Sequence, residues 1–264
     1  MDVTELVKQL KEKTPALVYL VLGTQQVLQE KALTAFLSLI PEEQQVMNVG
    51  RYDMEVTPVA SALNDAVSAP FFGERRLVII NKPYFLTNEK RGGKVDHDLS
   101  AVIKYLHHPE PTTTLVFLAP YEKLDGRKKL VKELKKVAVN VSAAPLDERS
   151  ARQRVEGQLR QAGFTIDDAA LELLVQRTNA DYGLMVANVA KLEILAYQDK
   201  HITAPMVKAL VPQSLDDNVF DLVTAVLRRD QPRSLELYQQ LLASQKQPLQ
   251  INAVLVSQFR LLIQ

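Results

Sequence analysis

The sequence contains no cysteine and no tryptophan, and only four of its 264 residues are histidine. The lack of cysteine excludes disulfides, thiol catalysis and every metal site that depends on a thiolate ligand. It also fits the reducing conditions of the cytoplasm. The histidines form no H-E-x-x-H motif, and no serine lies in a G-x-S-x-G motif. We therefore expect no catalytic site of these classes, no metal and no cofactor.

Long apolar runs are also missing. The uninterrupted apolar stretches, such as residues 16–22, 77–80 and 115–119, have the length of a strand, whereas a membrane span needs about 18 apolar residues. The charged segment 1–14 lacks the apolar run of about 7–15 residues that a signal peptide requires. We expect a soluble cytoplasmic protein that makes no contact with a membrane.

Neither sign of charge dominates. The chain has 32 basic and 31 acidic side chains, which argues against a strongly basic nucleic-acid-binding protein but leaves room for a local basic patch. Its 47% hydrophobic and 24% charged residues are typical of a folded globular protein. At about 100–150 residues per domain, the length predicts two domains and part of a third.

The first 145 residues alternate between short apolar runs and segments with helical periodicity, which predicts an α/β domain with a five-stranded parallel sheet. The expected strands are residues 16–22, 45–49, 77–80, 113–118 and 137–141. The expected helices are residues 2–13, 27–39, 58–69, 99–106 and 127–136. Thr57 followed by Pro58 predicts the N-cap residue and the first helical position of the third helix.

After residue 145 only helical patterns are found, and no strand is expected. Helices at 151–162, 167–178, 182–197 and 205–211 predict a small helical domain over residues 146–211. A linker at 211–214 precedes helices at 219–227, 233–243 and 248–264. The apolar face of the last helix reaches the final residue without a capping glycine. Residues 212–264 are therefore expected to begin a helical domain that the chain does not complete.

Residues 17–39 combine a strand, a glycine and a helix, the order found in P-loop nucleoside triphosphatases. Their motif G-x-x-x-x-G-K-[ST] needs a second glycine, a phosphate-binding lysine and a magnesium-binding hydroxyl. Counted from Gly23, these three positions hold Leu28, Gln29 and Glu30. Asn81 follows an apolar strand, where an acidic magnesium ligand is expected. We predict that the site binds no nucleotide; a divergent nucleoside triphosphatase and a domain unrelated to these enzymes remain as alternatives.

The helix expected at 127–136 carries the densest basic cluster, which Glu133 interrupts. Its lysines are Lys128, Lys129, Lys132, Lys135 and Lys136. The cluster is either a solvated helix face or a surface that contacts the phosphate groups of nucleic acid. The candidate DNA contacts are Lys128, Lys129 and Lys132. A second basic segment, at 90–94, is expected to be a polar loop that faces solvent.

Two adjacent phenylalanines, Phe71 and Phe72, lie between a predicted helix and a predicted strand, flanked by Pro70 and Gly73. Neighbouring residues in a turn point in different directions, so we do not expect both side chains to enter one core. One interpretation is that they cover the end of the sheet. The other is that they form a rigid hydrophobic plug for a pocket on a partner protein, since aromatic anchors contribute about 2 kcal/mol or more each to interfaces.

These features resemble the delta subunit family of the bacterial DNA polymerase III clamp loader, over essentially the whole chain. The most specific match is residues 70–78, in which the aromatic pair precedes a strand; weaker matches are 19–23, 219–222 and 258–262. The resemblance implies an AAA+-like module, consisting of an α/β domain and a helical lid domain, followed by a helical collar domain. These parts correspond to residues 1–145, 146–211 and 212–264, with the collar truncated.

In this family the delta subunit belongs to the DNA polymerase III holoenzyme, a DNA-directed DNA polymerase, and has no catalytic site of its own. The resemblance implies that the chain binds the ring-shaped sliding clamp, the beta subunit, and opens it for loading onto DNA without hydrolysing ATP. The hydrophobic pair that enters the clamp corresponds to Phe71 and Phe72. The supporting contacts correspond to Pro70, Gly73, Glu74 and Arg75.

The resemblance further implies contacts with the other loader subunits through the collar domain, and with DNA, weakly or within the assembled loader. It places the protein in the bacterial cytoplasm at the replisome. ATP binding by neighbouring subunits would expose or hide the aromatic pair. The sequence departs from the family at 189–193, where members often read Glu-Leu-Glu-Lys-Leu, so no contact is assigned there, and none is assigned in the missing part of the collar.

Overall fold

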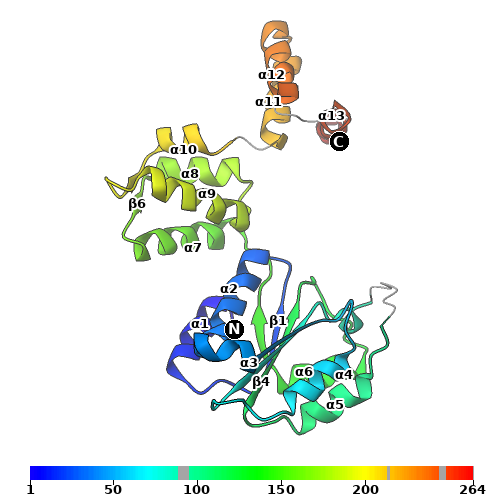
Figure 1. Cartoon of the computed structure of the whole chain (residues 1–264). Coiled ribbons are helices and arrows are strands. Elements are labelled where there is room, and N and C mark those ends of the chain that lie inside the picture. The colour runs from blue at the N-terminus through cyan, green and yellow to red at the C-terminus, as the bar shows by residue number, and fades with distance from the viewer. Residues whose placement is uncertain (89–94, 213–214, 244–247, 264) are drawn as a thin grey trace. The chain divides into compact units, whose positions relative to one another are not determined.

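The computed structural model describes residues 1–88, 95–212, 215–243 and 248–263 (Figure 1). Residue contacts divide the chain into two units, Met1–Pro145 and Leu146–Gln264. The predicted polar loop at 90–94 and part of the predicted linker at 211–214 lie outside the described residues. No helix within the four described ranges is both long and apolar enough to cross a membrane.

The first unit contains a five-stranded sheet in the order β2-β3-β4-β1-β5, and all neighbouring strands run parallel. The strands are β1 (Val18–Leu22), β2 (Val49–Asp53), β3 (Arg76–Asn81), β4 (Thr113–Ala119) and β5 (Val139–Ser142). The central strands are almost wholly apolar because helices cover both faces of the sheet. The predicted five-stranded parallel sheet is confirmed.

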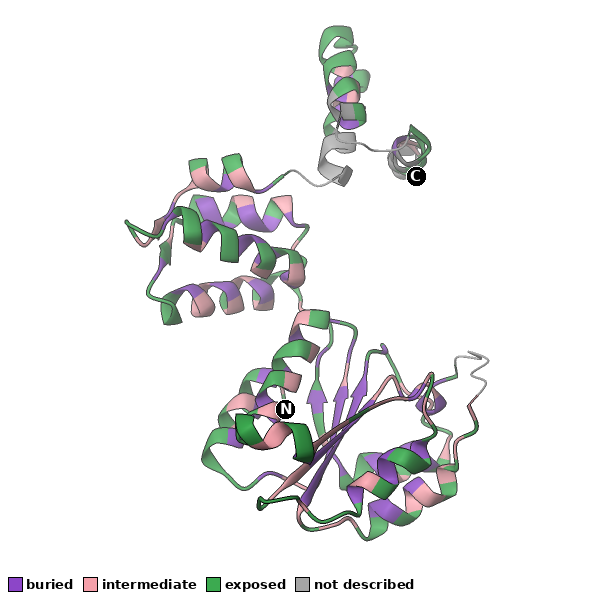
Figure 2. Ribbon diagram, viewed as in Figure 1, coloured by how far each residue is buried: buried purple, intermediate pink, exposed green. Residues whose placement is uncertain are grey.

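The helices of the first unit form a layer on each face of this sheet. They are α1 (Val3–Glu12), α2 (Gln26–Leu37), α3 (Gln45–Asn48), α4 (Val59–Ala66), α5 (Leu99–His107) and α6 (Lys129–Val137), with 3₁₀ turns η1 (Glu42–Gln44) and η2 (Tyr84–Leu86). One core packs α4, α5 and α6 against strand residues such as Leu20 and Phe117. On the other face, Tyr19 meets Phe36 of α2 edge to face, with 4.9 Å between ring centroids. Figure 2 shows the buried residues concentrated in the strands.

Because all strands are parallel, their ends form two distinct edges. The amino edge holds residues that precede strands, such as Asn48 before β2 and Arg75 before β3. The carboxyl edge holds residues that follow strands, such as Gly23 after β1 and Lys82 after β3. Each strand is four to seven residues long, so the two edges lie roughly 13–23 Å apart at about 3.3 Å per residue.

Two local predictions for the first unit are wrong. The strand expected at 45–49 is mostly the short helix α3, and β2 begins only at Val49. As an edge strand with mostly half-buried residues, β2 lacks the apolar run that marks a buried strand. Pro58, rather than Thr57, occupies the N-cap position of α4, and no N-cap side chain bonds to the helix.

The second unit begins with four helices that pack against one another. They are α7 (Glu148–Gln161), α8 (Asp168–Arg177), α9 (Tyr182–Leu195) and α10 (Ala204–Leu210). Two short strands, β6 (Thr165–Ile166) and β7 (His201–Ile202), pair in parallel beside them. The expectation of no strand after residue 145 is therefore wrong, since strands of two residues are too short to produce a periodicity.

Three further helices follow, α11 (Leu215–Leu227), α12 (Gln231–Ala243) and α13 (Pro248–Ile263). They share a small apolar cluster formed by Leu222, Val223, Ala225, Leu237, Leu241 and Ile251. The boundary near residue 212 and the assignment of these helices to a collar domain stay predictions.

His97 supplies the cap that α4 lacks. The backbone N–H of Val59 donates to His97 Nδ1 at 3.1 Å, so the neutral ring carries its proton on Nε2. Nε2 lies 3.1 Å from the Met54 carbonyl oxygen and 3.0 Å from the Tyr84 hydroxyl. Burial lowers the pKa of His97 below 6.5. A neutral imidazole thus satisfies a backbone donor at the start of α4.

We predict that the free energy of unfolding falls as the pH is lowered from about 7.5 to about 5.5, and that His97 contributes to this fall. The unfolded chain protonates His97 near pH 6.5, whereas the folded chain does so only at lower pH. Acid therefore favours the unfolded state. His97→Gln keeps an acceptor for the Val59 N–H but does not titrate, so urea denaturation at several pH values should show a shallower fall. His108→Gln, at an exposed helix end, is the control; identical slopes for the parent and His97→Gln would contradict the assignment.

Candidate functional site

Phe71 and Phe72 lie in residues 67–75, which join α4 to β3 at the amino edge and are named here the aromatic loop. Phe71 is 51% and Phe72 85% exposed, whereas Phe36 and Phe117 are fully buried. The two exposed rings meet edge to face, with 4.6 Å between centroids and 75° between planes. Neither ring is buried, so both are accessible to a partner, which favours the interpretation of the pair as a plug.

The backbone of Phe71 is held by Asn48, a fully buried residue at the end of α3. Asn48 Nδ2 donates to the Phe71 carbonyl oxygen at 2.8 Å, and Asn48 Oδ1 accepts from the Phe71 N–H at 2.7 Å. One side-chain amide therefore satisfies both backbone groups of Phe71 and fixes the orientation of this residue.

The residues after Phe71 form a tight turn. Phe72 has a φ of 49°, in the left-handed region that costs a non-glycine residue about 1–2 kcal/mol. Gly73 lies so close to η1 that a Cβ there would be 2.5 Å from Gln44 Oε1. Such a turn persists only where its surroundings hold it, and the segment from Gln44 to Asn48 supplies that support.

An ion pair joins the two elements that flank the loop. Arg76, the first residue of β3, donates through Nε to Asp65 Oδ1 at 2.7 Å and through a second nitrogen to the same oxygen. Its remaining terminal nitrogen reaches the Ala69 carbonyl oxygen at 3.3 Å. Gly50 makes room for this pair, because a Cβ there would lie 2.0 Å from Asp65 Oδ2. Burial, followed by a hydrogen bond with Asp65, raises the pKa of the neighbouring Tyr52.

The other predicted docking residues surround the aromatic pair. Pro70 is half-buried, and Gly73 and Glu74 are exposed. Gly73, Glu74 and Arg75 line a pocket of about 380 Å³ at the amino edge. The remaining lining residues are Leu39, Ile40, Pro41 and Gln44. The structure therefore brings all six predicted docking residues together in one exposed segment.

Gly23 lies at the carboxyl edge, where the phosphates of a nucleotide would bind in a P-loop protein. Its φ is 145°, and a Cβ there would lie 2.0 Å from the carbonyl carbon of Ala143. The Gly23 N–H donates to the Ala119 carbonyl at 3.2 Å, and the Gln25 N–H donates to the Ala143 carbonyl at 3.0 Å. A P-loop leaves N–H groups of this turn free to wrap phosphate, whereas both of these groups are bound within the first unit.

The other predicted positions of the degenerate nucleotide site differ in their surroundings. Leu28 is buried, and Gln29 Nε2 donates to the Gly23 carbonyl oxygen at 2.6 Å. Glu30 is exposed and accepts a hydrogen bond from Gln26 at 2.7 Å. Asn81 ends β3, which β4 separates from β1. The Gln29 amide therefore stabilises the turn at Gly23.

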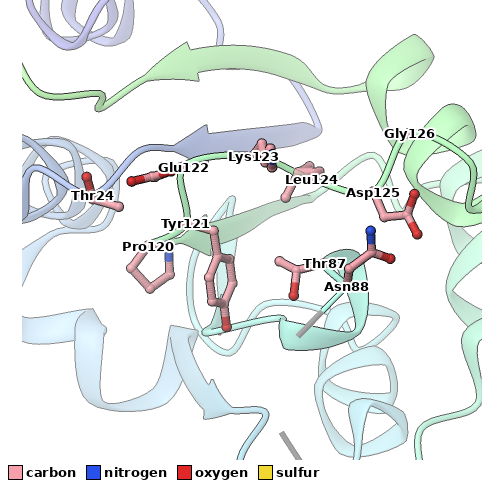
Figure 3. A pocket seen from close by; sticks show the side chains of 10 residues that line it. All are labelled: Thr24, Thr87, Asn88, Pro120, Tyr121, Glu122, Lys123, Leu124, Asp125 and Gly126. Carbon is pink, nitrogen blue, oxygen red and sulfur yellow. The ribbon is translucent and has the colours of Figure 1, made fainter. Parts of the chain in front are cut away.

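A pocket of about 670 Å³ lies at the same edge (Figure 3). It is lined by Thr24, Thr87, Asn88 and residues 120–126. Asn88 and Asp125 lie side by side, since one Arg127 nitrogen donates to both at 3.2 Å. Hydrogen bonds from Arg127 lower the pKa of Asp125. Among the described residues no group of three or more histidine, aspartate or glutamate side chains could hold a metal ion.

The three candidate DNA contacts differ in their surroundings. Lys128 Nζ donates to the carbonyl oxygens of Phe85 at 2.8 Å and Thr87 at 2.7 Å. Its ammonium group therefore ties the start of α6 to η2. Lys129 and Lys132 are exposed on α6, so they are the members of the predicted set that a phosphate group could reach.

Sequence reasoning did not find the residues that hold the aromatic loop in place. Asn48 lies 23 positions before Phe71, and Asp65 lies 11 positions before Arg76. No periodicity or motif links residues at such distances, because strand pairing brings them together. No sequence pattern predicted the pocket that residues 120–126 line.

Comparisons with known proteins give consistent matches. The family model described as "DNA polymerase III, delta subunit" matches residues 19–144, and that described as "DNA polymerase III delta subunit, C-terminal domain" matches residues 216–264. The DNA polymerase III subunit delta of Bacillus subtilis is 36% identical over 258 residues, which are 97% of this chain and 74% of that protein. A probable DNA polymerase III subunit delta of Aquifex aeolicus is 29% identical over 188 residues, 70% of this chain and 52% of that protein.

A solved structure is similar over the same extent. The Bacillus subtilis DNA clamp loader delta protein superposes with a TM-score of 0.74 at 35% sequence identity. The match covers 99% of this chain and 78% of that chain.

We predict that Asn48→Ala releases the aromatic loop without unfolding the first unit. Two hydrogen bonds to Phe71 are lost, which should lower the free energy of unfolding by about 1–2 kcal/mol in urea denaturation. Amide hydrogen exchange at Phe71 should become faster. Asn64→Ala, an exposed asparagine on α4, is the matched control, and unchanged exchange at Phe71 in Asn48→Ala would contradict the role given to Asn48.

Proposed function

This chain belongs to the family of DNA polymerase III delta subunits, and we propose that it binds the sliding clamp through Phe71 and Phe72 and opens the ring. The observation that carries the proposal is the exposure of two adjacent aromatic rings on a loop that is fixed at both ends. Exposed apolar side chains that adjoin one another in a patch mark interaction sites more often than single exposed ones do. As anchors in a partner's pocket they contribute about 2 kcal/mol or more each.

Clamp opening then follows from binding energy alone. A ligand shifts an equilibrium between two conformations only by the difference in its affinity for them. If the pocket for Phe71 and Phe72 is complementary in the open ring and distorted in the closed ring, the aromatic pair stabilises the open ring. Pro70, Gly73, Glu74 and Arg75 give the pair its shape and its polar surroundings.

We infer that the chain hydrolyses no ATP in this process. The Ala143 backbone packs against Gly23, and the N–H groups of Gly23 and Gln25 already donate to backbone carbonyls, so these two donors are not available to a phosphate. Leu28, Gln29 and Glu30 supply neither a phosphate-binding lysine nor a magnesium-binding hydroxyl. Nucleotide-driven steps would then belong to neighbouring loader subunits, which would expose or hide the aromatic loop.

The remaining partners of the proposal are the other loader subunits and DNA. Residues 212–264 form three helices with a small shared core, which fits a segment that completes its packing within an assembly. Lys129 and Lys132 are the residues of α6 that we propose for weak DNA contact, since Lys128 is bound to backbone carbonyls.

We predict that the double substitution Phe71→Ala with Phe72→Ala weakens clamp binding by at least about a hundredfold, because two aromatic anchors are removed. Binding is measured by titrating labelled clamp with the full chain. Far-UV circular dichroism and the free energy of unfolding should stay close to those of the parent. Tyr197→Ala, which removes another exposed aromatic ring, is the matched control. Retained clamp binding by the double variant would overturn the proposed function, whereas loss of the fold would indicate a core role.

We also predict that a fluorescent ATP analogue with magnesium shows no saturable binding to the full chain at micromolar concentrations. The physical reason is that the Gly23 and Gln25 N–H groups already donate to backbone carbonyls and that neither a lysine nor a hydroxyl occupies positions 29 and 30. A dissociation constant in the micromolar range would contradict this part of the proposal and favour a divergent nucleoside triphosphatase.

A further inference from the structure

We propose that Val46 and Met47 form a second apolar contact for the same partner that accepts the aromatic pair; this inference rests on the proposed function. Both residues belong to the short helix α3 at the amino edge. Val46 is 87% and Met47 56% exposed, so Val46 is as accessible as Phe72. Neither residue was assigned to the site from the sequence.

The position of α3 next to the aromatic loop is fixed by hydrogen bonds. Asn48, the residue directly after Met47, binds both backbone groups of Phe71. Gln44, two residues before Val46, lies against Gly73. The segment 44–48 therefore runs along the aromatic loop, and a partner surface that receives Phe71 and Phe72 meets Val46 and Met47 within one or two residues of that contact.

The two side chains are not needed to hold α3 in place. The helix is anchored by its polar residues: Gln45 Nε2 donates to the carbonyl oxygens of Leu37 at 3.2 Å and Ile40 at 3.1 Å, and Asn48 binds Phe71. Val46 and Met47 project apolar surface into solvent and contribute little to folding. Apolar side chains on a short, well-anchored helix beside an aromatic plug are a continuation of the same interface.

The chemistry of the pair fits a role beside a fixed plug. Valine has a single preferred rotamer in a helix, so it loses little freedom on binding. Methionine is flexible and polarizable, and it adapts to irregular apolar surfaces. The partner is therefore a protein with an apolar strip that flanks the pocket for Phe71 and Phe72. Phe71 and Phe72 are adjacent, so alone they would leave the partner free to rotate about them. A second contact at Val46 and Met47 fixes that rotation.

The test uses a double variant that carries both Val46→Ser and Met47→Ser, and compares it with a matched control variant. Val56→Ser is the control, because Val56 is also 73% exposed but follows β2 and lies at the opposite, carboxyl edge. In titrations of labelled clamp with the full chain, the double variant should bind at least about tenfold more weakly, since burial of one valine-sized side chain corresponds to roughly a tenfold change in affinity. Val56→Ser should stay within about twofold of the parent, and both variants should unfold at the same urea concentration as the parent.

The outcomes separate this inference from the proposed function. If the parent chain binds the clamp and Phe71→Ala with Phe72→Ala abolishes binding, but the Val46 and Met47 variant binds like Val56→Ser, the second contact is overturned and the proposed function stands. If the parent does not bind the clamp, the proposed function fails as well. The last measurement is sedimentation of the parent and of the double variant. If the parent self-associates, the double variant does not, and clamp binding is unchanged, the surface binds a second copy of the chain. That result would overturn the inference.

Discussion

The hydrogen bonds between the Asn48 amide and the Phe71 backbone decide whether the aromatic pair is a fixed projection or a mobile loop. Ordering the backbone of one residue on binding costs about 1–2 kcal/mol, and an aromatic loop of nine residues would lose much of its affinity in this way. With Asn48 holding the middle of the loop at Phe71 and the Asp65–Arg76 ion pair joining the elements on its two sides, the loop is ordered before the partner arrives. The unfavourable left-handed turn at Phe72 persists for the same reason.

The two edges of the parallel sheet carry different features. Ligands of open α/β sheets bind at the carboxyl ends of the strands, and at that edge of this chain the backbone of Ala143 packs closely against Gly23. The amino edge, which in such folds is largely structural, carries the exposed rings. Because each edge is built from different loops, Gly23 and its neighbours can lose phosphate-binding capacity without disturbing the residues that hold Phe71.

The sequence predicted the parts of the molecule that depend on local pattern. Buried strands such as β3 and β4 are continuous apolar runs, and the failure of the P-loop motif at Leu28 and Gln29 is visible by counting positions. The edge strand β2 was placed four residues too early because its half-buried residues form no apolar run, and the two-residue strands β6 and β7 were missed because they are too short to show a pattern. The sequence indicated that Phe71 and Phe72 are candidate contact residues, but it did not reveal the residues that hold their loop in place. Asn48, Asp65 and His97 act on residues brought to them by strand order, and only three-dimensional pairing reveals such contacts.

In the proposed function, rigidity is what allows a subunit that hydrolyses no ATP to change the conformation of its partner. Moving a ring from 1% to 99% open requires about 5.5 kcal/mol of preferential binding to the open form. The binding free energy of two aromatic anchors and a flanking apolar strip is of this magnitude. It favours the open ring only if these contacts differ between the open and the closed form. A mobile loop would follow the pocket as the ring closes and bind both forms equally, and such a ligand shifts nothing. A loop whose backbone is held by a buried amide cannot follow, so the loss of fit in the closed ring becomes the free-energy difference that favours opening.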